Sequence, residues 1–285
     1  MTGLALFAVP QVFDTNIVQQ LTSLLIFLIL AAMWNALAGY AGLVSVGQQA
    51  FIGFGAYGTI LITQQGVQPY LAMILAAVAS ALLVALHQGL GGGTGISLRG
   101  LNVYPREIRT AFTYWLTLGF AVLLLLLLFL LLRHRTGVAL QAIRDDEEAA
   151  ASLGVRVGRL KFVLFVLAGF GCGAAGALTL ANTLFIQPQS IFGVQWSAYL
   201  IFMVLVGGLG TFEGPIIGAI LFFVIQYEFA DLGAWYLIGL GLIAVAFALF
   251  LPRGLWSLIN DRLHIRLLPI GYHLIQRGRK AGGAN

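Results

Sequence analysis

Long apolar runs separated by short polar stretches dominate the 285-residue chain. No Asp, Glu, Lys or Arg occurs between Asp14 and Arg99, or between Lys161 and Glu213. A membrane-spanning helix needs about 20 apolar residues, so each charge-free run is long enough to cross more than once. We therefore predict an all-α polytopic membrane protein with about eight hydrophobic segments, at 17–38, 39–60, 69–86, 111–132, 162–181, 191–209, 216–229 and 234–251.

The segment 39–60, GYAGLVSVGQQAFIGFGAYGTI, is too rich in glycine for an ordinary helix, since each interior Gly costs up to about 1 kcal/mol relative to Ala. Irregular backbone at membrane depth is tolerated where it is buried in protein or lines a cavity, and interrupted segments often mark a transport site. We predict a broken or re-entrant helix here; close packing through small residues is the alternative. The predicted substrate pathway comprises Ser45, Gly47, Gln48, Gln49, Phe51 and Gly53.

The longest polar stretch is 133–161, RHRTGVALQAIRDDEEAAASLGVRVGRLK. A carboxylate at mid-bilayer costs roughly 2.5 to 3.5 kcal/mol, so the four consecutive acidic residues from Asp145 to Glu148 must lie outside the lipid. Good helix formers between Ala139 and Leu153 predict one short helix that stops at Gly154. A solvated loop without a specific role is the alternative.

A second glycine cluster lies in VGGLGTFEGPIIGA, residues 206–219. Its glycines at 210, 214 and 218 are spaced by four, so we expect them to line one helix face, and a proline suits the first turn. Glu213 is interpreted as a capping residue, with a functional carboxylate as the alternative. The predicted helix-packing motif comprises Gly208, Gly210, Gly214, Pro215 and Gly218.

Composition excludes a soluble domain, because 60% of residues are hydrophobic, 9% are charged and the mean hydropathy is +0.96. The net charge of +5 comes from basic residues clustered at 133–161 and 253–280, beside the ends of spans, which is typical of cytoplasmic segments and not of nucleic-acid binding. We expect a transmembrane domain over 1–252 that includes the 133–161 loop. A basic tail over 253–285 is expected to lie along the lipid headgroups.

Catalytic and metal-binding patterns are missing from the sequence. The single Cys172 supports no metal site, Ser45 does not stand in G-x-S-x-G, and the His residues are scattered. The run GGGTGISL at 91–98 is not followed by Gly-Lys-Ser/Thr, so it is not a phosphate loop. We expect no enzyme activity, metal or bound cofactor. A secondary transporter or channel would be expected to carry an ionisable residue mid-span, and the clean spans hold none.

Three separated motifs resemble those of one family. They are A-G-x-x-S-x-G-Q-x-A-F-x-G-x-G-A-Y at 41–57, E-A-A-x-x-x-G at 148–154, and V-G-G-L-G-T-x-x-G-P-x-x-G-A at 206–219. Together they are similar to the signatures of branched-chain amino acid ABC permeases. Many members of that family carry His where Gln48 stands.

The resemblance implies an ABC importer permease fold and a permease subunit that transports branched-chain or other apolar amino acids. It implies a heterodimer with a second homologous permease, two ATPase subunits that bind ATP and Mg, a periplasmic substrate-binding protein and surrounding membrane lipid. The expected location is the bacterial inner membrane, with the 133–161 loop and the C-terminus in the cytoplasm. The implied ATPase-coupling residues are Arg144, Asp145, Glu147, Glu148, Ala149, Ala150 and Gly154.

Two alternatives stay open at the level of sequence. A close relative that transports urea or short amides would carry similar motifs, and an ATP-independent secondary transporter or channel is the more distant possibility. The chain also departs from the family after the span at 69–86, where members usually continue into a basic cytoplasmic element and one further span. Here LVALHQGL leads directly into GGGTGISL, so either this protein has lost a crossing or the sequence omits a segment between Leu86 and Gly91; we predict the omission.

Overall fold

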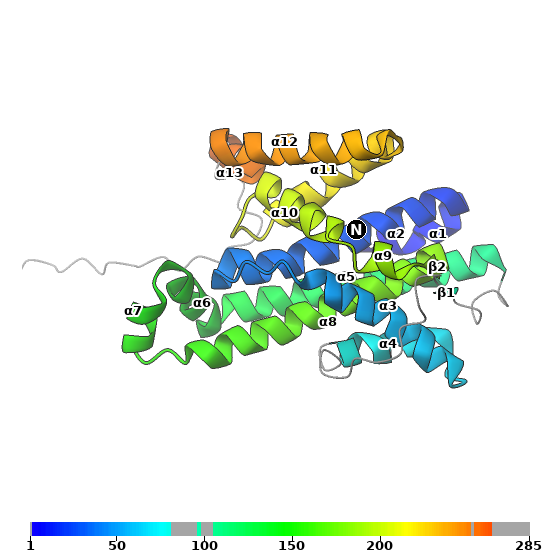
Figure 1. Ribbon diagram of the computed structural model, residues 1–285, viewed down its shortest axis with the longest axis horizontal. Helices are drawn as coiled ribbons and strands as arrows, with labels where there is room; N and C mark the ends of the chain where they lie inside the picture. Colours follow the sequence, from blue (N-terminus) through cyan, green and yellow to red (C-terminus); the bar gives the residue numbers. More distant parts are fainter. Residues whose placement is uncertain (1, 81–95, 98–104, 252–253, 264–285) are drawn as a thin grey trace, which may run out of the picture.

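The computed structural model describes residues 2–80, 96–97, 105–251 and 254–263, and most of these residues are helical (Figure 1). Helices satisfy every backbone polar group internally, which apolar surroundings require. The helices are α1 (Thr2–Val12), α2 (Thr15–Asn35), the π-helix η1 (Ala36–Tyr40), α3 (Gln48–Gln64), α4 (Pro69–Ser80), α5 (Arg106–Arg133), α6 (Arg135–Asp145), α7 (Glu147–Ser152), α8 (Val157–Thr183), α9 (Pro188–Ile191), α10 (Gln195–Gly207), α11 (Gly214–Phe229), the 3-10 helix η5 (Ala230–Leu232), α12 (Ala234–Phe250) and α13 (Gly254–Leu263); the strands are β1 (Ile96–Ser97) and β2 (Phe185–Ile186).

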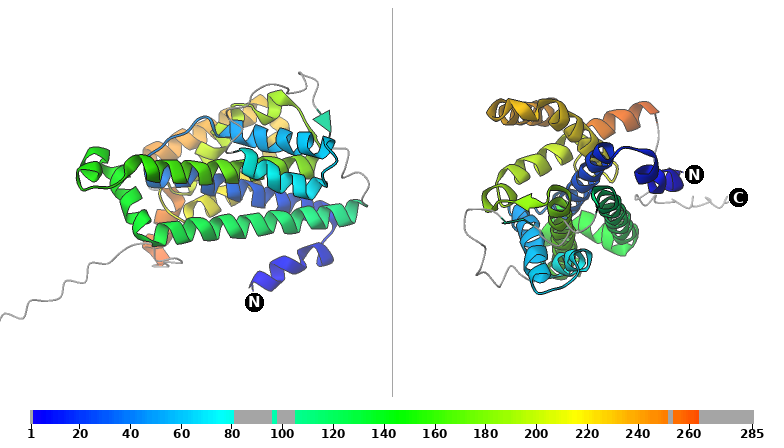
Figure 2. Two further views of the ribbon diagram at one scale, coloured as in Figure 1. Left: turned by 90° about the horizontal axis from the view of Figure 1, so that it is seen from below. Right: turned by 90° about the vertical axis from the view of Figure 1, so that its right-hand side faces the viewer.

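Three long helices, α2, α5 and α8, form the centre of the bundle and run along its long axis (Figure 1). Helices α6 and α7 project from one end, which we call the loop end, and the antiparallel pair β1–β2 marks the opposite, far end (Figures 1 and 2). Helices α10, α11 and α12 cover one side of the central three helices, and α3 with α4 cover the other (Figure 2). The site described below is built at the loop end and in the middle of this bundle.

Small residues allow the closest helix contacts. A Cβ atom added at Gly55 of α3 would overlap the carbonyl oxygen of Gly173 in α8, and one added at Gly176 would overlap that of Ile52. The same interlock joins α10 to α11, where a Cβ at Gly218 would overlap the carbonyl oxygen of Met203. Such backbone contact is the way apolar helices associate when lipid is as apolar as their side chains.

Five described helices are long and apolar enough to cross a membrane, and a sixth span is possible if the bent pair 235–250 and 254–260 counts as one. They are Thr15–Tyr40, Arg106–Arg133, Val157–Thr183, Pro188–Gly207 and Gly214–Leu232. The predicted class of all-α polytopic membrane protein is therefore confirmed, whereas the predicted number of about eight segments is not. Helix α4 covers the first part of the predicted 69–86 span.

The predicted break in the glycine-rich segment is confirmed. The chain leaves η1 at the loop end, turns back as an irregular stretch over 41–47, and enters α3 only at Gln48, deep in the bundle (Figure 1). Helix α13 packs against α10 and α11 at the start of the predicted tail. The rest of that tail, 264–285, and the predicted missing segment at 86–91 lie outside the described residues.

Candidate functional site

The polar loop at the loop end folds as two helices, so the prediction of one continuous helix is wrong. Helix α6 ends at Asp145, and α7 begins at Glu147. Between them Asp146 has an extended backbone, and its carboxylate accepts a hydrogen bond of 3.0 Å from the backbone N–H of Ala149. This is an N-cap, which short polar side chains form by satisfying a free helix N–H. The capping carboxylate therefore favours a new helix start over continuation of the old helix.

Gly154 ends the loop as the sequence predicted. Its φ of +85° lies in the left-handed region, and its N–H and that of Val155 donate to the carbonyls of Ala151 and Ala150. This pair of bonds is the Schellman ending that glycine favours. The ending leaves Leu153 84% exposed at the tip of the loop, a large apolar side chain that the sequence analysis did not single out.

Replacing Gly154 with alanine is expected to loosen this ending, because a Cβ in left-handed backbone costs roughly 1 to 2 kcal/mol. Hydrogen exchange at 149–155, measured by mass spectrometry on the purified chain, would then be faster than in the unchanged protein. Gly158→Ala is the matched control, since Gly158 has no positive φ and a Cβ there would meet nothing within 4 Å. Equal exchange rates in the two variants would contradict this role of Gly154.

Arg144 joins the loop to the rest of the bundle. Its Nη1 donates a hydrogen bond of 3.0 Å to the carbonyl oxygen of Gly39, in the π-helix that extends α2, and Asp145 accepts from its Nε and Nη2. The guanidinium also lies beside Gly210, where an added Cβ would be 2.9 Å from Nη1, and Gly42 faces the Arg144 Cα. Arg144 of the polar loop therefore meets Gly42 of the 41–57 motif and Gly210 of the 206–219 motif.

A second contact joins the end of α2 to the 206–219 motif without the loop. The Asn35 side chain donates to the carbonyl oxygen of Thr211 at 2.7 Å and accepts from the N–H of Gly210 at 2.9 Å. Asn35 is buried in the last turn of α2. The sequence signal for this role was an amide at the end of an otherwise apolar span, since a buried amide requires polar partners.

The expectation that Gly210 shares a helix face with Gly214 and Gly218 is wrong. Gly210 has a φ of +75° and lies in the turn before α11, which begins only at Gly214 with Pro215 in its first turn. Gly208 lies in the same turn, also with positive φ. Glu213 occupies the N-cap position of α11 and makes no side-chain capping hydrogen bond.

The predicted pathway residues divide into two groups. In the irregular stretch before α3, Val44 is 69% exposed and Gly47 is exposed, with nothing within 4 Å of an added Cβ. The carbonyl of Ser45 accepts a hydrogen bond of 2.9 Å from the indole of Trp34. Phe51 and Gly53 instead pack inside the protein, Phe51 edge-on to the ring of Phe165. The exposed stretch 44–47 is therefore the part of this motif that can face a solute or a partner.

Two glutamines begin α3, and each pairs with another helix. The Oε1 of the fully buried Gln48 accepts from the thiol of Cys172 on α8 at 2.9 Å. The Oε1 of Gln49 accepts from the hydroxyl of Ser197 on α10 at 2.6 Å, and Ser197 also lies 2.9 Å from the carbonyl oxygen of Val46. Ser197 was missed by the sequence analysis, although a serine near the start of an apolar span was its available signal. These contacts fix the start of α3 between two spans.

The chemistry of this site is that of binding and movement. The groups gathered around 41–49 are amides, a hydroxyl, a thiol and backbone carbonyls. Within the described ranges no group of three or more His, Cys, Asp or Glu side chains is placed to hold a metal ion. A broken helix beside polar side chains, joined through an arginine to an external loop, is typical of a membrane transport permease.

Comparison with known proteins identifies the family within that class. A family model described as "Branched-chain amino acid transport system / permease component" matches residues 92–259, more than half of the chain. The chain therefore belongs to the family of permease components of branched-chain amino acid transport systems. This confirms the resemblance that the three motifs indicated.

The chain is similar to the high-affinity branched-chain amino acid transport system permease protein LivM of Escherichia coli, with 32% identity over 176 residues, covering 62% of this chain and 41% of the relative. It is 26% identical to LivM of Salmonella typhimurium over 302 residues, covering 86% and 71%. The autoinducer 2 import system permease protein LsrC of Klebsiella pneumoniae is 35% identical over 117 residues, covering 39% and 33%. The chain thus spans less than half the length of the Escherichia coli relative. No solved structure matches the chain.

Proposed function

We propose that this chain is the transmembrane permease subunit of an ATP-driven importer of branched-chain or other apolar amino acids. Its partners would be a second homologous permease, two ATPase subunits that bind ATP and Mg, and a periplasmic substrate-binding protein. The complex would lie in the bacterial inner membrane. The observation that carries the proposal is the connection from the exposed α6–α7 loop through Arg144, which bonds to the carbonyl of Gly39 and lies beside Gly42 and Gly210 of the two other family motifs.

The loop end is proposed to lie in the cytoplasm. The stretch 133–161 holds six Lys and Arg residues, whereas the far end holds Arg106 and Arg109 among the described residues. Excess Lys and Arg in short loops favours the cytoplasmic side. The C-terminal segment, which follows α13 at the same end, would share that side.

The proposed mechanism is transmission of a rigid-body movement. ATPase closure would move α6 and α7, and Arg144 would carry the displacement to the carbonyl of Gly39. The irregular stretch 41–47 connects this point to the start of α3, so it would shift relative to the spans that hold Gln48 and Gln49. Such coupled motion of helices opens a path alternately to each side.

The substrate class is supported by the family and by the names of the LivM relatives. LsrC relatives are named for autoinducer 2 import, so related permeases serve other small solutes, and a urea or short-amide importer is the alternative for this chain. A channel or secondary transporter would not need an external loop joined to the core by an arginine.

Purification from native membranes in mild detergent tests the proposal. The expected result is co-purification of a P-loop ATPase and a second permease, together with ATP-dependent uptake of labelled leucine, isoleucine or valine after reconstitution with the binding protein. A chain that purifies alone, with no associated ATP hydrolysis, would refute the importer. Uptake of urea and not of amino acids would show that the proposed substrate class is wrong, but it would still support an ATP-driven importer.

The exposed tip of the loop supplies a sharper test. Burial of Leu153 in a partner would contribute roughly 1.5 to 3 kcal/mol, so Leu153→Asp is expected to weaken ATPase binding about tenfold or more. The measurement is the salt-resistant fraction of ATPase that stays with the purified permease. Leu153→Met keeps an apolar side chain of similar volume and should retain the ATPase. Full retention by the aspartate variant would show that the ATPase docks elsewhere.

A further inference from the structure

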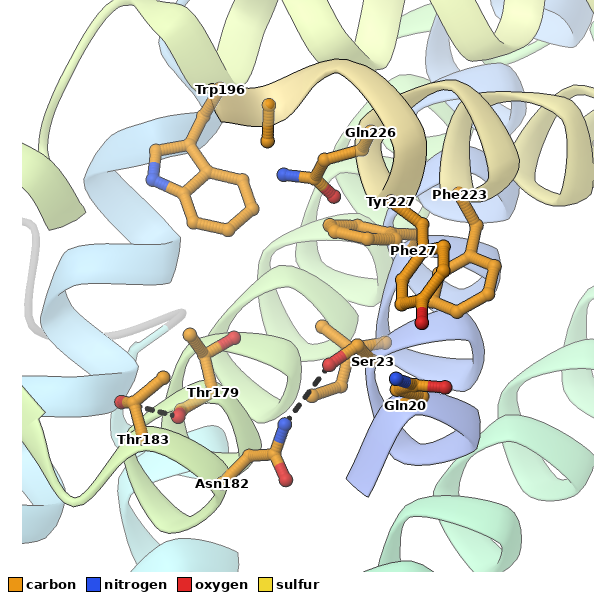
Figure 3. Close-up of a pocket in the computed structure, with 12 residues that line it drawn as sticks. Gln20, Ser23, Phe27, Thr179, Asn182, Thr183, Trp196, Phe223, Gln226 and Tyr227 are labelled. Atoms are coloured by element: carbon orange, nitrogen blue, oxygen red, sulfur yellow. Dashed lines mark hydrogen bonds between the residues drawn. The ribbon is translucent and has the colours of Figure 1, made fainter. Parts of the chain in front are cut away.

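A pocket of about 430 Å³ lies in the far-end half of the bundle (Figure 3). Its walls come from the N-terminal half of α2 beyond its first turn, the last turns of α8, the start of α10 and the end of α11. These are the far-end portions of all four helices, so the pocket lies on the side opposite α6 and α7 (Figure 1). Its volume falls in the range of small-molecule sites, about 300 to 1,000 Å³.

The wall of the pocket is both polar and apolar, and it is uncharged. Phe27, Trp196 and Phe223 supply aromatic surface, while Gln20 and Gln226 supply side-chain amides (Figure 3). Among the described residues neither amide has a hydrogen-bond partner within the protein, although both are partly buried. Each amide therefore presents a donor and an acceptor to a ligand.

Asn182 and Ser23 form the fixed part of the polar wall. The Asn182 amide donates to the Ser23 hydroxyl at 3.0 Å, which joins α8 to α2 across the pocket (Figure 3). Trp196 is oriented by the hydrogen bond of 3.0 Å from its indole to the carbonyl of Ser190. The adjacent Ser197 contacts Gln49, so the first turn of α10 separates this pocket from the start of α3.

Aromatic rings close the pocket toward the loop end. Phe27 meets Phe222 edge-on, with ring centroids 5.0 Å apart. Phe222 is fully buried, and its ring centroid lies 4.8 Å from that of Tyr199. The pocket is thus bounded on its inner side by a packed layer from α2, α10 and α11.

We propose that this pocket is an outer binding site for the transported solute, in addition to the pathway around 41–49. This proposal rests on the proposed function. The ligand class is a small amphipathic zwitterion, with its apolar side chain against the aromatic surface and its ammonium and carboxylate groups against the amides. A solute with a net charge would be bound poorly, because the pocket holds no opposite charge and desolvation of an unpaired ion is costly.

Cysteine protection tests this site in the complete transporter. The single native cysteine, Cys172, is fully buried, so a thiol introduced by Thr179→Cys in the pocket wall provides the reactive group. A charged methanethiosulfonate reagent is added without ATP, in the presence of leucine or lysine. At ten times its dissociation constant leucine should slow the labelling about tenfold, whereas lysine should not. Gln65→Cys, an exposed control outside the pocket, should be labelled equally with either amino acid.

The amides are tested in the same background. Adding Gln226→Leu should raise the leucine concentration needed for half-protection about five- to tenfold, the effect of losing one or two hydrogen bonds. If leucine does not slow labelling at position 179, or if no labelling occurs there, the pocket proposal is wrong. Leucine uptake by the Gln65→Cys control would still support the importer in that case. Protection by urea alone would overturn the amino acid ligand.

Discussion

Arg144→Ala is expected to reduce leucine uptake at least about tenfold while the transporter still assembles, because hydrogen bonds from charged groups are worth roughly 1.5 to 3 kcal/mol. The guanidinium supplies the hydrogen bond from α6 to the Gly39 carbonyl, and it lies beside Gly210, which itself packs against Gly39. Alanine would leave the carbonyl without this donor and the loop without its polar connection to the core. ATP hydrolysis should persist with little transport, the pattern of an uncoupled importer.

Arg159→Ala is the matched control for charge. Arg159 is exposed near the start of α8, belongs to the same basic stretch, and makes no hydrogen bond within the part of the chain that the structure describes. Its loss should leave the ratio of amino acid transported to ATP hydrolysed unchanged. Arg144→Lys should fall between the wild type and Arg144→Ala, since lysine keeps the charge but not the planar fork that reaches Gly39 and Asp145 together. An unchanged ratio in Arg144→Ala would show that force reaches the core by another route.

The overall class of this protein could be predicted from the sequence by simple physics, whereas the helix boundaries could be predicted less accurately. Charge-free runs longer than a bilayer allow only spanning helices, and the glycine-rich break at 41–47 was visible because glycine and glutamine together disfavour a continuous span. The break at Asp146 was missed, although aspartate is a weak helix former and a favoured N-cap residue, because the apolar residues on both sides of it suit one continuous helix. Only the capping bond to Ala149 shows why one helix ends there and another begins.

Residues of the site were largely identified from the motifs, whereas their mutual contacts could not be. Arg144 and Gly39 are 105 positions apart, and Asn35 and Thr211 are 176 apart, so no local pattern places them together. The outer pocket was missed because its amides, such as Gln20 and Gln226, are single polar residues in apolar runs. Such residues have no spacing pattern; their shared location appears only when the helices are packed.

The predicted missing segment remains a prediction, with one observation relevant to it. The alignment to LivM of Salmonella typhimurium runs over 302 residues yet covers 86% of this 285-residue chain, so the relative holds residues inside the aligned region that have no counterpart here. Residues 86–91 themselves lie outside the described part of the structure. The intact mass of the purified chain, compared with the 30.5 kDa of the printed sequence, tests it directly.

Gly176→Ala is expected to destabilise the folded permease by about 1 to 3 kcal/mol, which corresponds to a fall in melting temperature of roughly 5 °C or more. The added Cβ would overlap the carbonyl oxygen of Ile52, a backbone atom of α3 that cannot move without displacing that helix. Gly55→Ala should have a similar effect, because its Cβ would overlap the carbonyl oxygen of Gly173. Thermal denaturation followed by size-exclusion chromatography in detergent measures both.

Gly119→Ala on α5 separates this effect from the loss of a glycine as such. A Cβ there would meet nothing within 4 Å, and alanine favours a helix over glycine by up to about 1 kcal/mol, so this variant should melt at the wild-type temperature or above. Uptake should fall in Gly176→Ala and Gly55→Ala even below their melting temperatures, since both displace α3 from the span that holds Cys172 against Gln48. If all three variants melted together, α3 and α8 would not be in backbone contact, and the start of α3 would not be held where the proposed pathway requires it.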